Sequence, residues 1–222
     1  MSEMNFERAR YNMIEQQIRP WSVLDYHVLD VLGRLPRDRF VPAPYRRLAY
    51  SDTRVPLDHG QTMMPPVVEG RLLQGLELHD DDHVLEIGTG SGYMTACLAS
   101  LVQAVDSVDI HEDFVASARE RLGELGFTNV NFATGDASAG WDGGRQYDAI
   151  AITGAVPEVP EAYKRALAPG GRLFAIIGDA DQPIMEAVQV MRVGTDEWSV
   201  ESLFETWVAP LINAQRPRRF EF

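Results

Sequence analysis

Hydrophobic and polar positions change their spacing near residue 82 of this 222-residue chain. Before that point, apolar residues recur at short helical intervals, and prolines at 42, 44, 56, 65 and 66 prevent a long helix after Pro36. One helical face is expected at Phe6, Ala9, Met13 and Gln17, and a second at Val28, Val31, Leu32 and Leu35. Residues 1–80 are therefore expected to form a cap of short helices and loops.

After residue 82, short apolar runs alternate with helical patterns. We expect strands at His83 to Ile87, Val105 to Ile110, Asn129 to Ala133, Asp148 to Thr153 and Arg172 to Ile177. Helical spacing lies between them, at Met94, Cys97, Leu98 and Leu101 and again at Phe114, Val115, Ala118, Leu122 and Leu125. Strand and helix in alternation predict an α/β fold with a doubly wound, mostly parallel sheet.

Two later apolar stretches complete this prediction. Met185 to Val193 fits a helix or a strand, and Leu203 to Leu211 is expected to finish the edge of a seven-stranded sheet. Residues 81–222 are thus predicted to be the main domain, with the cap packed on it as one structural unit.

Composition narrows the class without changing this fold. With 45% hydrophobic and 24% charged residues the chain is an ordinary globular one. Its lone Cys97 cannot form an internal disulfide, and the five His, at 27, 59, 79, 83 and 111, show no zinc-type spacing, so no metal is expected. The absence of a long apolar run and the charged start of the chain predict a cytoplasmic protein without a membrane partner.

The formal charge of −13 bears on partners. An anionic surface repels phosphate backbones, so we expect no binding to nucleic acid. Arg216, Arg218 and Arg219 near the end of the sequence are interpreted as solvated residues rather than as a binding patch.

A glycine loop is the first chemical signal. Gly88, Gly90 and Gly92 stand between the first strand and the helix expected from Tyr93. Glycine there allows a tight turn and a close approach of a ligand to the backbone. Dinucleotide-binding proteins use GxGxxG, and here the third glycine comes one residue too early, which disfavours a nicotinamide cofactor.

Two acidic residues follow at the ends of the next strands. Asp109 comes 21 residues after Gly88, where a carboxylate can accept both ribose hydroxyls of a nucleoside, and Asp136 can accept the amino group of adenine. Taken alone, Asp109 can also cap a helix and Asp136 can belong to a turn. Together with the glycine loop, in strand order, they favour an adenosyl pocket.

At this point the chain resembles a family, the protein-L-isoaspartate O-methyltransferases among the class I S-adenosylmethionine-dependent methyltransferases. The stretches Arg37-Asp38-Arg39-Phe40-Val41-Pro42 and Gly60-Gln61-Thr62 are specific to that family, and Val84 to Tyr93 belongs to the whole superfamily. Further similar pieces are Ala49 to Asp52, Tyr147 to Ile150, Gly170 to Leu173 and Val208 to Leu211. The resemblance implies a Rossmann-like methyltransferase that methylates the carboxylate of L-isoaspartyl residues in damaged proteins.

The resemblance also implies which residues bind. The cofactor S-adenosyl-L-methionine, or its product S-adenosyl-L-homocysteine, is expected at Glu86, Gly88, Thr89, Gly90, Ser91, Gly92, Asp109, Ile110, Asp136 and Ala137, and the substrate at Gln61, Thr62, Met63 and Met64. One departure stands out, because Met64 occupies the place of a serine that the family carries at the reaction centre.

Chemistry leaves the methyl acceptor open. A carboxylate is already ionised at neutral pH, so methyl transfer to it needs alignment rather than a general base. Thr62 is the hydroxyl retained nearest the missing serine, and His59 is the candidate base for an amine or phenol acceptor. The alternatives are a methyltransferase of the same fold with another small-molecule or protein acceptor, and a cofactor-binding protein without turnover. An N-methyltransferase of nucleic acids is disfavoured, because Ile152-Thr153-Gly154-Ala155 lacks the Asn/Asp-Pro-Pro-aromatic signature.

Overall fold

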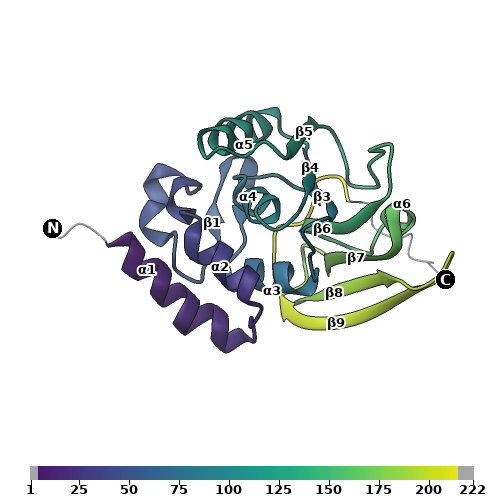
Figure 1. Cartoon of the computed structure of the whole chain (residues 1–222), viewed down its shortest axis with the longest axis horizontal. Coiled ribbons are helices and arrows are strands. Elements are labelled where there is room, and N and C mark those ends of the chain that lie inside the picture. Colours follow the sequence, from purple (N-terminus) through teal and green to yellow (C-terminus); the bar gives the residue numbers. More distant parts are fainter. Residues whose placement is uncertain (1–4, 215–222) are drawn as a thin grey trace.

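A seven-stranded sheet forms the centre of the molecule in the computed structural model, which describes residues 5–214 (Figure 1). Its strands are β3 (His83–Ile87), β4 (Ala104–Asp109), β5 (Val130–Thr134), β6 (Tyr147–Val156), β7 (Leu167–Ile177), β8 (Met185–Arg192) and β9 (Trp198–Thr206). They lie in the order β5-β4-β3-β6-β7-β8-β9, in which β8 pairs antiparallel with β7 and β9 and the pairs from β5 to β7 are parallel. The predicted mostly parallel seven-stranded sheet is confirmed. Arg216, Arg218 and Arg219 lie outside the described residues.

The last two strands refine the sequence prediction. The ambiguous stretch from Met185 is a strand, and its antiparallel hairpin pairs Met185 with Thr206 and Arg192 with Trp198. The final strand therefore begins earlier than expected and ends at Thr206. The prediction of a strand to Leu211 was wrong, because the chain leaves the sheet edge after Thr206 and returns to β6, where Leu211 N donates to Ala155 O (2.9 Å).

Short helices and turns form the N-terminal cap, as predicted. It contains α1 (Phe6–Met13), continued by π-helical and 3₁₀ turns to Trp21, and α2 (Tyr26–Arg34). The Asp25 carboxylate caps α2 by accepting from the backbone N–H groups of His27 (2.8 Å) and Val28 (3.1 Å). Residues 37–65 hold 3₁₀ turns and the two-stranded ribbon of β1 (Val55–Pro56) and β2 (Thr62–Met63).

Four further helices accompany the sheet: α3 (Pro66–Gly75), α4 (Tyr93–Ala99), α5 (Glu112–Glu124) and α6 (Glu161–Ala166). None of the helices in residues 5–214 is long and apolar enough to span a membrane.

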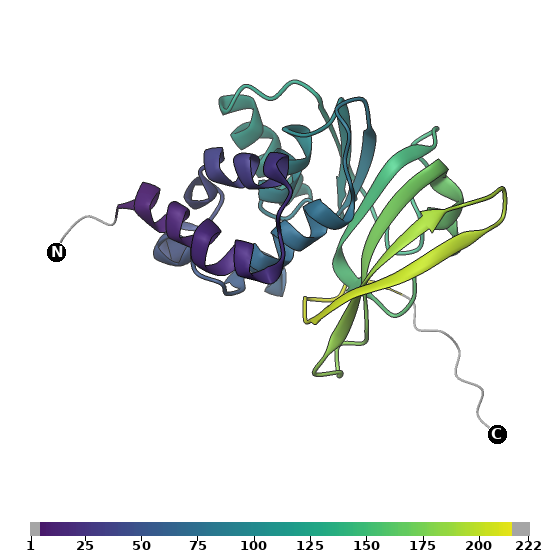
Figure 2. The same cartoon turned by 60° about the horizontal axis from the view of Figure 1, so that its bottom comes forward.

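Alternation along the strands separates two apolar cores. Val84 and Phe174 face the cap, α3 and α4, whereas Leu85 and Leu173 face Tyr163 of α6 on the other side. The first core is continuous from Met13 in α1 to Val208 beyond β9. Figure 2 shows the cap helices to one side of the sheet and the β8–β9 hairpin away from them. A division at residue 80 stays a prediction, and the two parts share this core.

Candidate functional site

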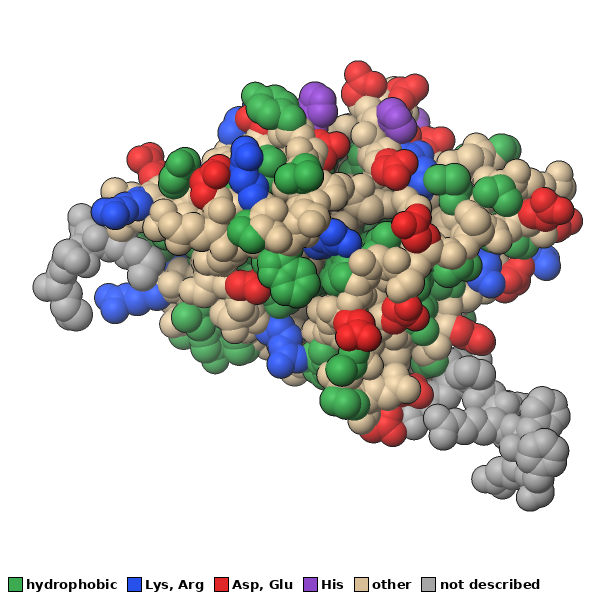
Figure 3. Space-filling model, turned by 90° about the horizontal axis from the view of Figure 1, so that it is seen from below, with side chains coloured by type: hydrophobic (Ala, Val, Ile, Leu, Met, Phe, Trp, Pro, Cys, Tyr) green, Lys and Arg blue, Asp and Glu red, His purple; other side chains and the backbone are tan. Residues whose placement is uncertain are grey.

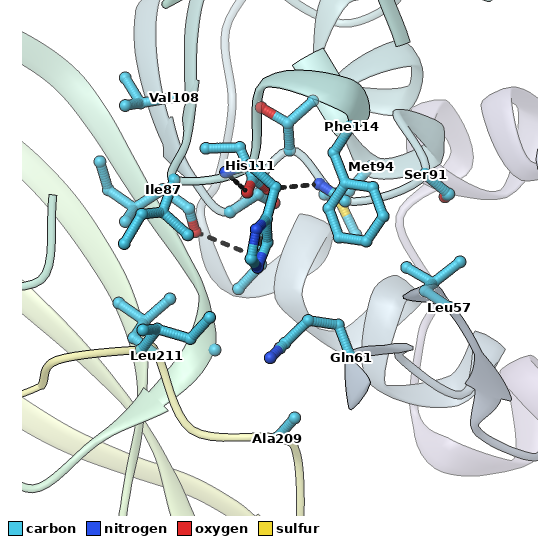
Figure 4. A pocket seen from close by; sticks show the side chains of 18 of the residues that line it. Leu57, Gln61, Ile87, Ser91, Met94, Val108, His111, Phe114, Ala209 and Leu211 are labelled. Atoms are coloured by element: carbon cyan, nitrogen blue, oxygen red, sulfur yellow. Dashed lines mark hydrogen bonds between the residues drawn. The ribbon is translucent and has the colours of Figure 1, made fainter. Parts of the chain in front are cut away.

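A pocket opens at the carboxyl ends of β3, β4 and β6, where ligands bind in doubly wound sheets (Figure 4). The strand order of the sheet reverses direction between β3 and β6, and this reversal leaves a crevice at their carboxyl ends. The pocket is lined by the β3–α4 loop, the ends of β4 and β6, the turn after β5, the cap loop (residues 57–65) and the strap (residues 207–212). Each of these segments contributes one wall.

The glycine loop gives the first wall, with Gly88, Thr89, Gly90 and Ser91 facing the pocket. Gly88 has φ +100°, and a Cβ there would lie 2.3 Å from Thr153 Oγ1. That hydroxyl donates to the carbonyls of Ile87 (2.9 Å) and Gly88 (2.8 Å), which fixes the loop to β6. Gly92 does not line the pocket; a Cβ there would lie 2.8 Å from the Cβ of Ala118, so it permits α4 to approach α5.

Glu86 also lies outside the pocket lining, although the family resemblance assigns it to the cofactor. Its fully buried Oε2 accepts from the hydroxyls of Thr95 (2.5 Å) and Ser107 (2.6 Å), and Ser107 Oγ lies 2.6 Å from Thr89 Oγ1. Burial raises the pKa of Glu86 to about 8, against the opposing effect of these two hydrogen bonds. Glu86 therefore supports the glycine loop from behind.

Asp109 closes the pocket at the end of β4 and is 8% exposed. Its Oδ2 accepts from the backbone N–H of Gly90 (2.8 Å) and its Oδ1 from that of His111 (2.9 Å). The carboxylate thus joins β4 to the glycine loop and is not the side-chain cap of α5, which has none. Because each carboxylate oxygen can accept more than one hydrogen bond, Asp109 retains capacity for a pair of hydroxyl donors.

Asp136 lies at the exposed end of the same pocket. Its Oδ1 accepts a hydrogen bond from the backbone N–H of Ser138 (2.9 Å), two residues further on, and this bond closes a turn. Its Oδ2 accepts from Asn213 Nδ2 (2.8 Å). The hydrogen bond from the Ser138 N–H, followed by that from Asn213, lowers the pKa of Asp136, so the carboxylate is ionised at neutral pH. Ala137, 7% exposed, lines the pocket beside it, as does Ile110.

The cap loop forms the wall opposite the glycine loop. Gln61, Thr62, Met63 and Met64 all line the pocket, and Met64 is 7% exposed. Figure 4 shows Gln61 on the side of the cap, across from Ile87 and His111. His59, in the turn Asp58–Gly60 of the same loop, does not line the pocket and contacts His111.

A buried Arg37–Glu69 ion pair supports this loop, and nothing in the sequence pattern predicts it. Arg37 is fully buried, and its Nε and Nη2 donate to the two oxygens of Glu69 (2.9 and 3.0 Å). It also donates to the carbonyls of Ala49 (2.7 Å) and Met64 (2.7 Å). Burial lowers the pKa of Arg37, but the charge and hydrogen bonds of Glu69 outweigh burial and raise it, so the guanidinium is charged.

The strap completes the pocket. Val208, Ala209, Leu211 and Ile212 line it, and two backbone hydrogen bonds to Ala155 attach the segment to β6. In Figure 4 Leu211 lies on the side of the sheet, near Ile87 and across the opening from Gln61. Val208 to Leu211 belong to a stretch predicted as a strand, because an apolar run does not distinguish a strand from a pocket wall.

Comparisons with known proteins agree with this architecture. The profile of the family described as protein-L-isoaspartate(D-aspartate) O-methyltransferase matches residues 8–215. A protein-L-isoaspartate O-methyltransferase 2 of Pelobacter propionicus is 39% identical over 211 residues, which are 95% of this chain and 93% of the relative. A protein-L-isoaspartate O-methyltransferase of Myxococcus xanthus is 40% identical over 85% of this chain and 90% of its own length.

Solved structures are similar in fold. A protein-L-isoaspartate O-methyltransferase superposes with a TM-score of 0.78 at 24% identity, over 93% of this chain and 67% of the other. A Plasmodium falciparum protein of the same description, in complex with S-adenosyl-L-homocysteine, gives a TM-score of 0.78 at 19% identity, over 95% of this chain and 99% of the other.

Proposed function

The chain belongs to the protein-L-isoaspartate(D-aspartate) O-methyltransferase family, and on that premise we propose that it methylates the carboxylate of L-isoaspartyl residues with S-adenosyl-L-methionine as methyl donor. The activity is protein repair, and S-adenosyl-L-homocysteine is the product of the donor. One observation supports the proposal above the rest: a single pocket is lined by the glycine loop with Asp109 and Asp136 and, on the opposite wall, by Gln61 to Met64. Donor and acceptor can therefore meet inside it.

The residues present fit the cofactor. A Cβ at Gly88 would clash with Thr153 Oγ1 at 2.3 Å, so glycine there lets the loop lie against β6 with its backbone along the pocket. Asp109 offers two acceptor oxygens for hydroxyls, and Asp136 with Ala137 offers an acceptor beside an apolar surface. We assign Gly88, Thr89, Gly90 and Ser91 to the methionine part, Asp109 and Ile110 to the ribose, and Asp136 and Ala137 to the adenine. Glu86 and Gly92 act through the loop that they support.

Alignment and exclusion of water are what the protein contributes. When bound, S-adenosyl-L-methionine supplies a methyl group on a positively charged sulfur. The acceptor carboxylate is ionised without help, so no residue has to remove a proton. Gln61 and Thr62 offer an amide and a hydroxyl donor that can orient a carboxylate, and the apolar strap, with Leu211 and Ile212, limits water.

Met64 favours a second candidate. Its buried side chain gives the acceptor wall a thioether, which is a weak hydrogen-bond acceptor and donates nothing. With Met63 beside it, that wall also suits a less polar acceptor of the same methyl transfer. Met64 bears only on which acceptor is methylated, and the assignment of the cofactor does not depend on it.

The partner is a polypeptide carrying isoaspartate rather than a nucleic acid. On the face in Figure 3, basic side chains lie apart from one another among acidic and hydrophobic ones. With a formal charge of −13, such a surface repels a phosphate backbone. The cytoplasmic location expected from the sequence belongs to this proposal.

The test is labelled methyl transfer from S-adenosyl-L-methionine to an isoaspartyl peptide, with the aspartyl peptide of the same sequence as control. We expect base-labile label in the isoaspartyl peptide alone. Equal labelling of both peptides, or none in a protein that binds S-adenosyl-L-homocysteine, would reject the isoaspartyl acceptor. Absence of S-adenosyl-L-homocysteine binding would reject the methyltransferase itself.

A further inference from the structure

Two histidines from separate segments meet at the mouth of the pocket. His59 lies on the turn Asp58–Gly60 of the cap, and His111 directly precedes α5. Their rings stack with centroids 3.9 Å apart and an angle of 9° between planes, and the ring of Phe114 lies edge-on to both at 5.3 Å. The stack brings the ring nitrogens of two imidazoles from separate segments close together.

A carboxylate completes the cluster. His59 Nε2 lies 2.9 Å from Asp113 Oδ2 and 3.1 Å from Oδ1, and one donor atom from each of His59, His111 and Asp113 lies within 4.8 Å of the others. The hydrogen bond with His59 lowers the pKa of Asp113, so it is an anion at neutral pH. The 2.9 Å separation is already close to that of two neighbouring donors on one dication, each about 2.0–2.2 Å from the ion.

His111 supplies an independent observation. Its Nε2 is buried and, within residues 5–214, has no hydrogen-bond partner. Its backbone is fixed, because its N–H donates to Asp109 (2.9 Å). Such an imidazole nitrogen, in a ring stacked on that of His59, is available as a metal ligand.

We propose that His59, His111 and Asp113 form a site for a single Zn²⁺-like transition-metal dication. Two imidazoles and one carboxylate suit Zn²⁺, Co²⁺ or Ni²⁺, whereas Mg²⁺ and Ca²⁺ prefer oxygen ligands alone. On binding, the ion takes the place of the proton between His59 Nε2 and Asp113, and that proton moves through solvent to Nδ1 of the same ring, so the imidazole binds the ion as a neutral ligand. The bound ion joins the cap turn to the start of α5, next to the pocket wall formed by His111.

Zinc binding to the full-length, tag-free protein tests this site without cofactor or acceptor, so its outcome is independent of methyl transfer. Isothermal titration with Zn²⁺ after chelator treatment should give one ion per chain. His59→Gln and Asp113→Asn should each weaken binding at least about tenfold, since each removes a ligand. His27 is an exposed histidine on α2, so His27→Gln is the matched control and should leave the affinity for Zn²⁺ unchanged.

Co²⁺ provides a second readout on the unaltered protein. Its visible absorption should show imidazole coordination, and the band should disappear when a chelator removes the ion. The side chains of His59 and Asp113 are 40% and 59% exposed, so both variants should fold, which circular dichroism checks. Lack of Zn²⁺ binding by the wild-type protein, or equal affinity in both variants, would overturn the proposal.

Discussion

Removing the guanidinium of Arg37 should destabilise the protein strongly. Arg37→Met leaves the carboxylate of Glu69 buried without its counter-charge, and it removes a donor from the carbonyls of Ala49 and Met64. The Arg37 and Glu69 side chains are 0% and 3% exposed, so solvent screens the pair little. Breaking a buried ion pair of this kind costs about 3–5 kcal/mol.

The size of the effect sets the assay. For a chain of this length each kcal/mol corresponds to roughly 2–4 °C, so the midpoint of thermal unfolding should fall by about 6–20 °C. Urea unfolding followed by circular dichroism gives the free energy directly. Arg39→Met is the control, because Arg39 is an exposed residue of the same 3₁₀ turn and should change stability by less than about 0.5 kcal/mol.

A second substitution separates charge from packing. Adding Glu69→Leu to Arg37→Met removes the stranded carboxylate and should recover part of the loss, about 1–3 kcal/mol. Two results would refute the reasoning. One is a cost below about 1 kcal/mol for Arg37→Met alone, and the other is a double variant less stable than the single one.

Three further predictions concern the pocket and the group behind it. Asp109→Ala should weaken S-adenosyl-L-homocysteine binding at least about tenfold by calorimetry, because bonds to a charged acceptor contribute about 1.5–3 kcal/mol each; Asp106→Asn, on the same strand, should not, and equal affinities would remove Asp109 from the site. Met64→Ser should raise kcat/KM for an isoaspartyl peptide with unchanged cofactor affinity, by several-fold if one neutral hydrogen bond of about 1 kcal/mol is regained; an unchanged rate would show that the thioether is harmless. The raised pKa of Glu86 means that the folded state holds its proton while the unfolded state loses it above about 4.5, so this group's stabilisation falls as pH rises from there to about 8. Glu86→Gln should therefore gain stability relative to wild type across that interval in urea titrations, and a constant difference would contradict the buried-acid interpretation.

The sequence predicted the parts of the structure that depend on local pattern. The strand from His83 to Ile87 and the end of α2 before Pro36 follow from periodicity and proline chemistry, and both are confirmed. The glycine loop, Asp109 and Asp136 could be placed together because the ends of parallel strands meet at one edge. Their convergence on one pocket depends also on the strand order, which the structure supplies.

Contacts between distant segments could not be predicted in this way. Arg37 and Glu69 are 32 residues apart, and neither residue type indicates burial. His59 and His111 show no ligand spacing because they belong to different segments, so histidine counting predicted no metal there. Glu86 and Gly92 belong to the glycine-loop motif, but neither residue lines the pocket. Their side of the loop packs against the protein behind it, which the motif alone does not show.

The hydrogen bond from Arg37 to the cap loop ends on a main-chain oxygen, that of Met64. Every amino acid has this atom, so the attachment of the loop does not depend on which side chain stands at position 64. The attachment of the loop and the choice of acceptor therefore depend on different atoms of residue 64. Its side chain can be exchanged while its carbonyl keeps the hydrogen bond from Arg37. Because Met64 also belongs to the apolar core, a smaller residue there would change stability through packing and not through the hydrogen bond from Arg37.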